Sequence, residues 1–150
     1  MKIKIKTEVA GNYRNIAAGF DLQLFEYLVP PFTKVKIKEF TGSKKGDRVH
    51  VQFIFPMKTE WISAITADGS DEREVFFVDE GVKLPPGLGY WKHRHVIQKG
   101  GSDTSLIIDD IEFKGSNRIL DYLLYLPLWI TFSMRIPMYK RYFKKFSKNG

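Results

Sequence analysis

Two of the chain's three histidines, His93 and His95, lie two residues apart and follow Trp91 at the same spacing. Side chains two residues apart in a β-strand point to the same face of the sheet. A strand here would therefore present one large aromatic ring and two titratable rings together. Such a face can bind a metal ion, transfer protons, or line a cavity in which buried polar groups satisfy one another.

A metal site would need more than the two histidines. Zinc takes at least three protein ligands, and the sequence offers Asp79, Glu80 and Asp109 as further candidates. Each can serve only if a neighbouring strand carries it to the histidines. We therefore expect no metal and no other cofactor, although the residue types leave the metal hypothesis open.

Proton transfer would need a carboxylate beside the imidazoles, which can then titrate near neutral pH. Asp109 is the best partner, because its strand follows His95 through the short turn Lys99–Asp103 and should pair with the histidine strand. Neighbouring strand residues face opposite ways, so Asp110 should face solvent. The catalytic candidates are therefore His93, His95 and Asp109. The alternative is a structural patch, in which the same groups only satisfy one another.

Hydrophobic periodicity predicts the elements that position these residues. Seven segments have the alternating pattern of strands: Lys2–Val9, Thr33–Phe40, Val49–Phe55, Lys58–Ala67, Glu74–Asp79, Tyr90–Val96 and Thr104–Phe113. After Asn12, helical spacing predicts two short helices. These helices end before Pro30 and Pro31, because the residue before a proline avoids the helical conformation.

The apolar segment Arg118–Phe146 has either to span a membrane or to form a helix covered by the sheet. Asp121, Arg135 and a proline within it argue against a span. Helical spacing places five apolar residues on one face of a helix: Ile119, Tyr122, Leu123, Leu126 and Ile130. We expect the sheet to cover this helix. Pro127 and Pro137 should each kink or break this helix.

An antiparallel meander must bury its apolar face against something, and the last helix is the only element long enough. We therefore predict an α+β fold in one domain over residues 1–150. A seven-stranded curved antiparallel sheet would wrap around the long C-terminal helix, with two short helices after the first strand and a cavity inside. The composition, with 43% hydrophobic and 15% aromatic residues, suits a large apolar interior.

Charge and cysteine content narrow the choice of function. The chain has no cysteine, which excludes disulfides and thiolate chemistry. Its first residues alternate lysine and isoleucine and lack the apolar run of a signal peptide, so we expect a cytoplasmic location. The net charge of +7 is concentrated in part near the C-terminus, at Lys140, Arg141, Lys144, Lys145 and Lys148. No nucleic-acid-binding motif accompanies this charge, which argues against a nucleic-acid partner and leaves peripheral contact with an anionic membrane open.

Several motifs occur in an order that resembles a known family. A tryptophan on a middle strand, a Phe-x-Asp strand, a Trp-x-His-x-His strand and an aspartate on the last strand appear as Trp61, Asp79, Trp91–His95 and Asp109. Together with Thr131–Arg135 on the last helix, they resemble the START-like, or SRPBCC, superfamily. The closest resemblance is to its bacterial ligand-binding members. One departure is Pro137, where an uninterrupted helix is expected.

This resemblance implies a helix-grip fold, polyketide cyclase-like, with a cavity for a hydrophobic or amphipathic small molecule such as a lipid or a polyketide. We expect a binding protein rather than an enzyme. The alternative is a cyclase or hydratase that uses the His/Asp patch in the same cavity. The residues predicted to contact the ligand are Phe53, Phe55, Trp61, Asp79, Trp91, His93, His95, Asp109 and Arg135. Arg135 would either balance the charge of Asp109 from the helix or simply reach solvent.

Overall fold

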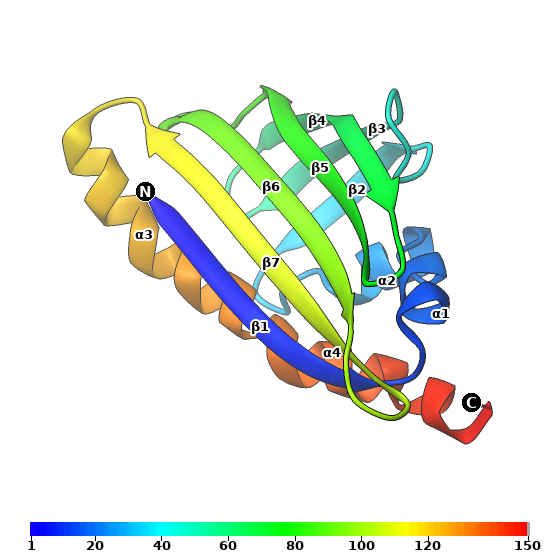
Figure 1. The fold of residues 1–150 in the computed structure, drawn as a ribbon. Helices are drawn as coiled ribbons and strands as arrows, with labels where there is room; N and C mark the ends of the chain where they lie inside the picture. Colours follow the sequence, from blue (N-terminus) through cyan, green and yellow to red (C-terminus); the bar gives the residue numbers. More distant parts are fainter. Residues whose placement is uncertain (150) are drawn as a thin grey trace.

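The computed structural model describes residues 1–149, with the side chains of residues 1–146, and is dominated by a seven-stranded antiparallel sheet (Figure 1). All seven predicted strands are present, and the last four extend further than predicted. The strands are β1 (Lys2–Ala10), β2 (Lys34–Phe40), β3 (Arg48–Phe55), β4 (Thr59–Ser70), β5 (Glu74–Lys83), β6 (Leu88–Lys99) and β7 (Thr104–Gly115). Their order in the sheet is β1-β7-β6-β5-β4-β3-β2, so the first strand lies beside the last.

Two short helices, α1 (Tyr13–Ala18) and α2 (Leu22–Tyr27), follow β1 as expected. Each begins at a side-chain cap. The side-chain oxygen of Asn12 accepts a hydrogen bond from the Arg14 backbone N–H at 2.9 Å, and that of Asp21 accepts one from the Leu24 N–H at 3.0 Å. Such caps satisfy backbone donors that a short helix cannot pair internally.

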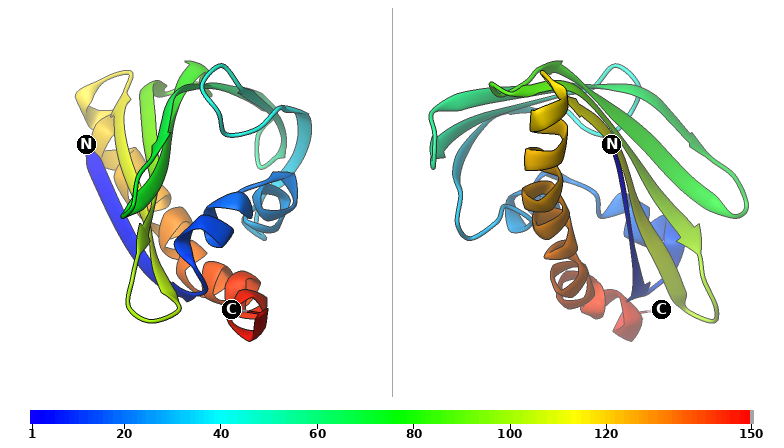
Figure 2. Two further views of the ribbon diagram at one scale, coloured as in Figure 1. Left: turned by 45° about the vertical axis from the view of Figure 1, so that its right-hand side comes forward. Right: turned by 90° about the vertical axis from the view of Figure 1, so that its left-hand side faces the viewer.

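The C-terminal segment forms α3 (Arg118–Ser133), α4 (Arg135–Phe143) and a final 3-10 turn, η1 (Lys144–Asn149). Figure 2 shows the sheet curving over these helices, which cross its concave side. Helix α3 packs on β7 and β1, and α4 packs on β1. The predicted helix-grip architecture is therefore observed.

The two prolines of this segment behave differently. The helix is interrupted at Met134, three residues before Pro137, as predicted, and Pro137 lies in the first turn of α4, where its missing N–H is least disruptive. The break predicted near Pro127 is absent, and α3 runs through it. The carbonyl left without a partner there belongs to Leu123, which is exposed, so solvent can hydrate it.

The prediction of which face of the helix the sheet covers was also wrong. The inward residues of α3 are Leu124, Leu128 and Phe132, which pack with buried residues of the sheet. The apolar residues chosen from the sequence point outward instead, and Trp129 joins them. Their exposed fractions lie between 42% and 71%: Ile119, Tyr122, Leu123, Leu126, Trp129 and Ile130. By length and composition alone, Arg118–Phe146 is the one helix of the described chain that could cross a membrane.

Candidate functional site

A cavity of about 340 Å³ lies between the concave face of the sheet, helix α2 and the C-terminal helices. Its walls are mostly apolar, with Phe20, Leu24, Phe25, Leu28, Val35, Val51, Phe53, Trp61, Ile65, Phe77, Trp91, Leu128 and Phe132 among them. The ionisable side chains on the walls are Asp21, Asp79, His93, His95, Arg135 and Tyr139. A concave apolar site with a few polar groups is typical of small-molecule binding sites.

Seven of the nine residues predicted to contact a ligand line this cavity: Phe53, Trp61, Asp79, Trp91, His93, His95 and Arg135. The placement of Phe55 was wrong. Its side chain is 59% exposed at the end of β3, immediately before Pro56, where the strand stops. Asp109 is fully buried and lies behind the histidines, so it supports the cavity wall without forming its surface.

The strand β6 presents Trp91, His93 and His95 to the same concave face, as the period of two predicted. Both carboxylates lie on strands that pair with β6. Asp109 on β7 is directly opposite His95, and Asp79 on β5 is directly opposite His93. The predicted pairing of the Asp109 strand with the histidine strand is therefore confirmed.

Each histidine makes its shortest contact with the diagonal carboxylate. His93 Nε2 lies 2.9 Å from Asp109 Oδ1, and His95 Nε2 lies 2.9 Å from Asp79 Oδ2. Carboxylates only accept hydrogen bonds, so both Nε2 atoms carry the proton and donate it. Asp79 accepts a further hydrogen bond from Trp91 Nε1 at 3.1 Å, which ties the aromatic wall to the same group.

The two histidines differ in their electrostatic surroundings. Burial and the positive charge of His93 together lower the pKa of His95 to about 4, outweighing the attraction of Asp79. His95 is therefore neutral at neutral pH. The other nitrogen of His93 lies 3.7 Å from Asp79 Oδ2, so this ring has a carboxylate oxygen near each nitrogen.

The carboxylates remain ionised despite their burial. Burial raises the pKa of Asp79, but the hydrogen bond from His95 and the charge of His93 outweigh it and leave the pKa below its usual value. The same balance holds for Asp109, where the hydrogen bond and charge of His93 and the charge of Arg135 outweigh burial and lower the pKa.

Helix α4 completes the network from the other side. Tyr139 donates its hydroxyl proton to Asp109 Oδ1 at 3.4 Å, and Arg135 Nη1 lies 3.7 Å from the same oxygen. Burial and the charge of Asp109 raise the pKa of Tyr139, which keeps its phenol protonated. Arg135 therefore stands where a counter-charge to Asp109 was predicted. Tyr139 was missed, although its position four residues after Arg135 places both on one helix face.

Aromatic rings hold the histidines in place. The rings of His93 and His95 lie 3.6 Å apart between centroids, and Phe77 stacks on the outer side of His95 at 4.3 Å. Phe132 from α3 meets His93 edge-on at 5.2 Å. Trp61 meets Trp91 edge-on at 4.8 Å further along the wall. These contacts fix the ring orientations, and the sequence alone gave no sign of the Phe77 and Phe132 contacts.

Three of these groups have the chemistry and spacing of metal ligands. One ligand atom from each of Asp79, His93 and His95 lies within 4.8 Å of the others. Glu80 alternates with Asp79 along β5 and does not line the cavity. A metal bound to His95 Nε2 and Asp79 Oδ2 would have to displace the hydrogen bond between these two atoms, whereas His95 Nδ1 is buried without a hydrogen-bond partner.

The polar patch can act on a bound molecule in two ways. The side chains of Asp79, His95 and Arg135 are 15%, 12% and 16% exposed, so each offers some polar surface to the cavity. They can orient a polar end of a ligand by hydrogen bonds or charge. His95 and Asp79 could also transfer a proton to or from a bound molecule, since they share a hydrogen bond.

No family model and no curated protein matches this sequence. Solved structures do match its fold. A norcoclaurine synthase mutant from Thalictrum flavum superimposes with a TM-score of 0.69 at 14% identity, covering 97% of this chain and 94% of that one. An aromatase/cyclase from a Streptomyces species gives a TM-score of 0.72 at 10% identity, with the same coverage of 97% and 94%.

A protein from Mycobacterium smegmatis matches with a TM-score of 0.68 at 16% identity, over 96% of this chain and 91% of that chain. These similarities extend over nearly the whole length of both chains, and they agree with the sheet order and the gripped helix described above. At such low identities they bear on the fold alone. The chain therefore has a helix-grip fold, like these solved structures.

Proposed function

We propose that this protein binds a hydrophobic or amphipathic small molecule, of lipid or polyketide type, in the cavity between sheet and helices. The cavity itself carries the proposal, with a volume of about 340 Å³ and mostly apolar walls. Protein interiors are normally packed at the density of organic crystals, with few voids larger than a water molecule. A cavity of this size falls within the volumes of small-molecule sites, which start at about 300 Å³.

The expected binding mode follows from the distribution of polarity. Burial of the ligand's apolar surface would supply affinity at roughly 25 cal/mol per Å². The polar patch of Asp79 and His95 on the sheet and Arg135 on α4 would orient a polar end of the ligand. This arrangement favours molecules with one polar end over pure hydrocarbons, because the patch must stay hydrated or hydrogen-bonded when the cavity fills.

The experiment has two parts. Native mass spectrometry of protein produced in different hosts would detect a co-purified ligand, and displacement of a lipophilic fluorescent dye would report cavity binding. The variant Val35→Trp places an indole at the cavity wall and should weaken dye binding at least about tenfold. Val82→Trp is the matched control, since Val82 is 61% exposed and does not line the cavity. Equal binding by both variants, or no binding by the unmodified protein, would refute the proposal.

A second candidate function is acid–base catalysis of the cyclase or hydratase type on the bound molecule. One observation favours it, namely that the hydrogen-bonded pair of His95 and Asp79 lines the cavity. The structural neighbours include a synthase and an aromatase/cyclase, but a shared fold does not carry an activity. A substrate screen would test it. Once a substrate is found, full activity of His93→Gln and His95→Gln would exclude these residues as catalytic groups.

A further inference from the structure

An exposed apolar face on α3 takes no part in the cavity. This α3 outer face comprises Ile119, Tyr122, Leu123, Leu126, Trp129 and Ile130, all at least 42% exposed. The spacing of three and four residues forms one continuous stripe along the helix, about 16 Å long at 1.5 Å per residue. Single exposed apolar residues are ordinary, but a contiguous stripe marks an interaction surface.

The stripe continues into a positively charged end. Met134, between α3 and α4, has helical dihedral angles (φ −62°, ψ −22°), so α4 continues the helical spacing of α3. The face that carries Ile130 therefore continues through the exposed Pro137 to the cations Lys140, Arg141 and Lys144. These three cationic residues are exposed. One side of the C-terminal helices is therefore apolar and aromatic in its first half and basic in its second.

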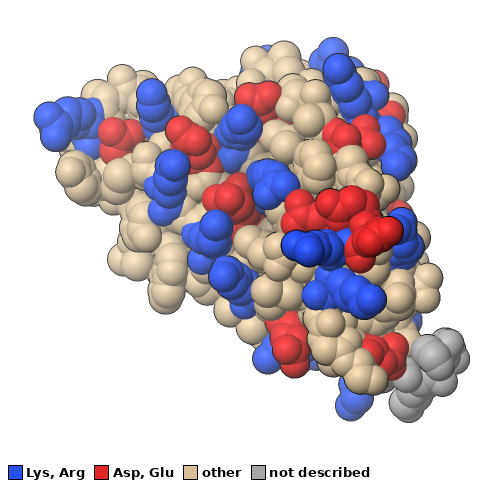
Figure 3. Space-filling model, in the orientation of Figure 1, with Lys and Arg blue, Asp and Glu red and all other residues tan. Residues whose placement is uncertain are grey.

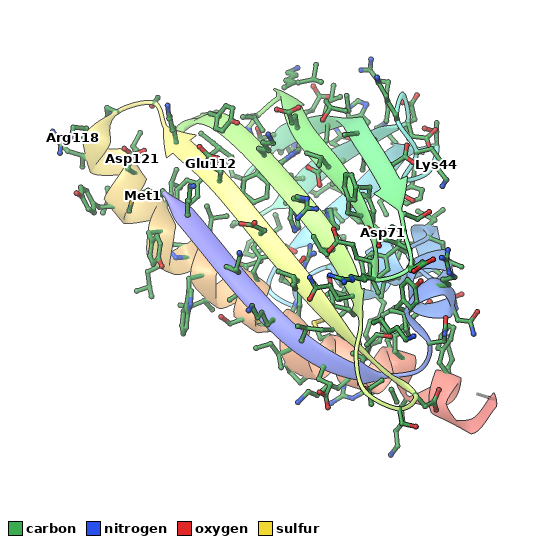
Figure 4. All side chains as sticks on the ribbon, in the orientation of Figure 1. Met1, Lys44, Asp71, Glu112, Arg118 and Asp121 are labelled. Carbon is green, nitrogen blue, oxygen red and sulfur yellow. The ribbon has the colours of Figure 1, made fainter. Side chains whose placement is uncertain are left out.

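Acidic side chains are scarce on the C-terminal helices. The sequence contains no aspartate or glutamate after Asp121. That carboxylate is held at the start of α3, where it accepts a hydrogen bond from the Gly115 N–H at 2.6 Å (labelled in Figure 4). In Figure 4, side chains also project from α3 away from the sheet. In Figure 3, blue and red residues mix over the strands, whereas the lower left edge, where α3 lies, is uncharged.

We propose that the α3 outer face lies flat on an anionic lipid bilayer. Apolar and aromatic residues on one helix face, followed by cations, form the pattern of helices that bind in the plane of a membrane. Trp129 and Tyr122 would lie at the level of the headgroups, and Lys140 and Arg141 would meet anionic lipid. The opposite side of these helices packs against the protein, where Phe132 of α3 and Tyr139 of α4 are buried, so we propose binding in the plane of the bilayer rather than across it.

Charge complementarity favours a bilayer over a second copy of the chain. A copy that docked through the same face would offer another uncharged stripe and another basic end, and its chain after Asp121 has no aspartate or glutamate for Lys140 or Arg141 to face. A bilayer with anionic lipid supplies both an apolar layer and negative charge in the same plane. The inference goes beyond ligand binding, since it concerns the opposite face of α3 and is tested with no cavity ligand present.

The test is flotation of the purified protein with vesicles of phosphatidylcholine alone and with vesicles that also contain phosphatidylglycerol. We expect binding to the anionic vesicles, weakened by added salt. Leu123→Glu should reduce it at least about tenfold, and Lys140→Ala or Arg141→Ala about fivefold each. Val82→Glu is the matched control, because Val82 is 61% and Leu123 63% exposed. The control should bind like the unmodified protein.

Trp129 provides a second readout. Trp61 and Trp91 line the cavity, so a blue shift of tryptophan fluorescence on adding anionic vesicles should disappear in Trp129→Phe. Absence of vesicle binding by the unmodified protein overturns the proposal, as does equal loss of binding in Leu123→Glu and Val82→Glu. A dimer that Leu123→Glu disperses, without any vesicle binding, also overturns it and assigns the face to a second copy.

Discussion

The buried carboxylate of Asp109 has an exposed twin at the next position, and the pair allows a matched test of the charge network. Asp109→Asn keeps the shape of the side chain and removes its charge. The hydrogen bond from His93 at 2.9 Å loses its ionic partner, and Arg135, 3.7 Å away, loses its nearest counter-charge. Breaking one member of a buried ionic network costs about 3 kcal/mol or more, because the remaining charges stay buried.

For a chain of this length, each kcal/mol shifts the unfolding temperature by about 2–4 °C. Asp109→Asn should therefore lower the unfolding temperature by about 6–12 °C, as measured by circular dichroism at neutral pH. Asp110→Asn removes a surface pair with Lys4 at 3.7 Å, which contributes about 1 kcal/mol at most, and should change the unfolding temperature by no more than about 4 °C. Equal shifts for the two variants would refute the reasoning, since the network would then contribute no net stability.

Two further predictions concern the histidines. Because the pKa of His95 falls from 6.5 to about 4 on folding, the unfolded chain binds this proton more strongly. The free energy of unfolding should therefore drop by about 3 kcal/mol as the pH falls from neutrality to about 4, and His95→Gln should lose that part of the pH dependence in urea titrations. If the free energy of unfolding of His95→Gln fell with pH as steeply as that of the unmodified protein, another group would be responsible for the pH dependence. Dialysis against EDTA should leave the unfolding temperature unchanged, because His95 Nε2 and Asp79 Oδ2 are held by their mutual hydrogen bond without a metal; a clear drop would establish a bound metal.

The strand face of the site was predictable, and its partners were predictable only in part. The period of two is a property of any strand, so Trp91, His93 and His95 had to share one face. Asp109 could be placed because a short turn joins β6 to β7. The partner of His95 could not be predicted, because the strand before the loop was expected to end at Asp79 and the strand after it to begin at Tyr90, whereas β5 runs to Lys83 and β6 begins at Leu88. The register that sets Asp79 opposite His93 depends on that loop.

The errors at α3 and Phe55 have a common origin. Periodicity shows that apolar residues share a face but not which of two apolar faces turns inward, and α3 carries leucines on both sides. The sheet selects the side with Leu124 and Leu128, which fit against β7 and β1. Phe55 continues the alternation of β3, but the strand ends there, beyond the region that helices cover.

The free edge of β2 carries a consequence for how molecules of this protein meet one another. Lys34, Lys36 and Lys38 alternate along this edge strand with their side chains exposed. Two irregularities in its pairing with β3 also disturb its straight line. A second sheet docking there would bring two rows of lysines within roughly 5 Å of each other, the spacing of paired strands. Repulsion along this row is therefore expected to disfavour pairing of two β2 edges.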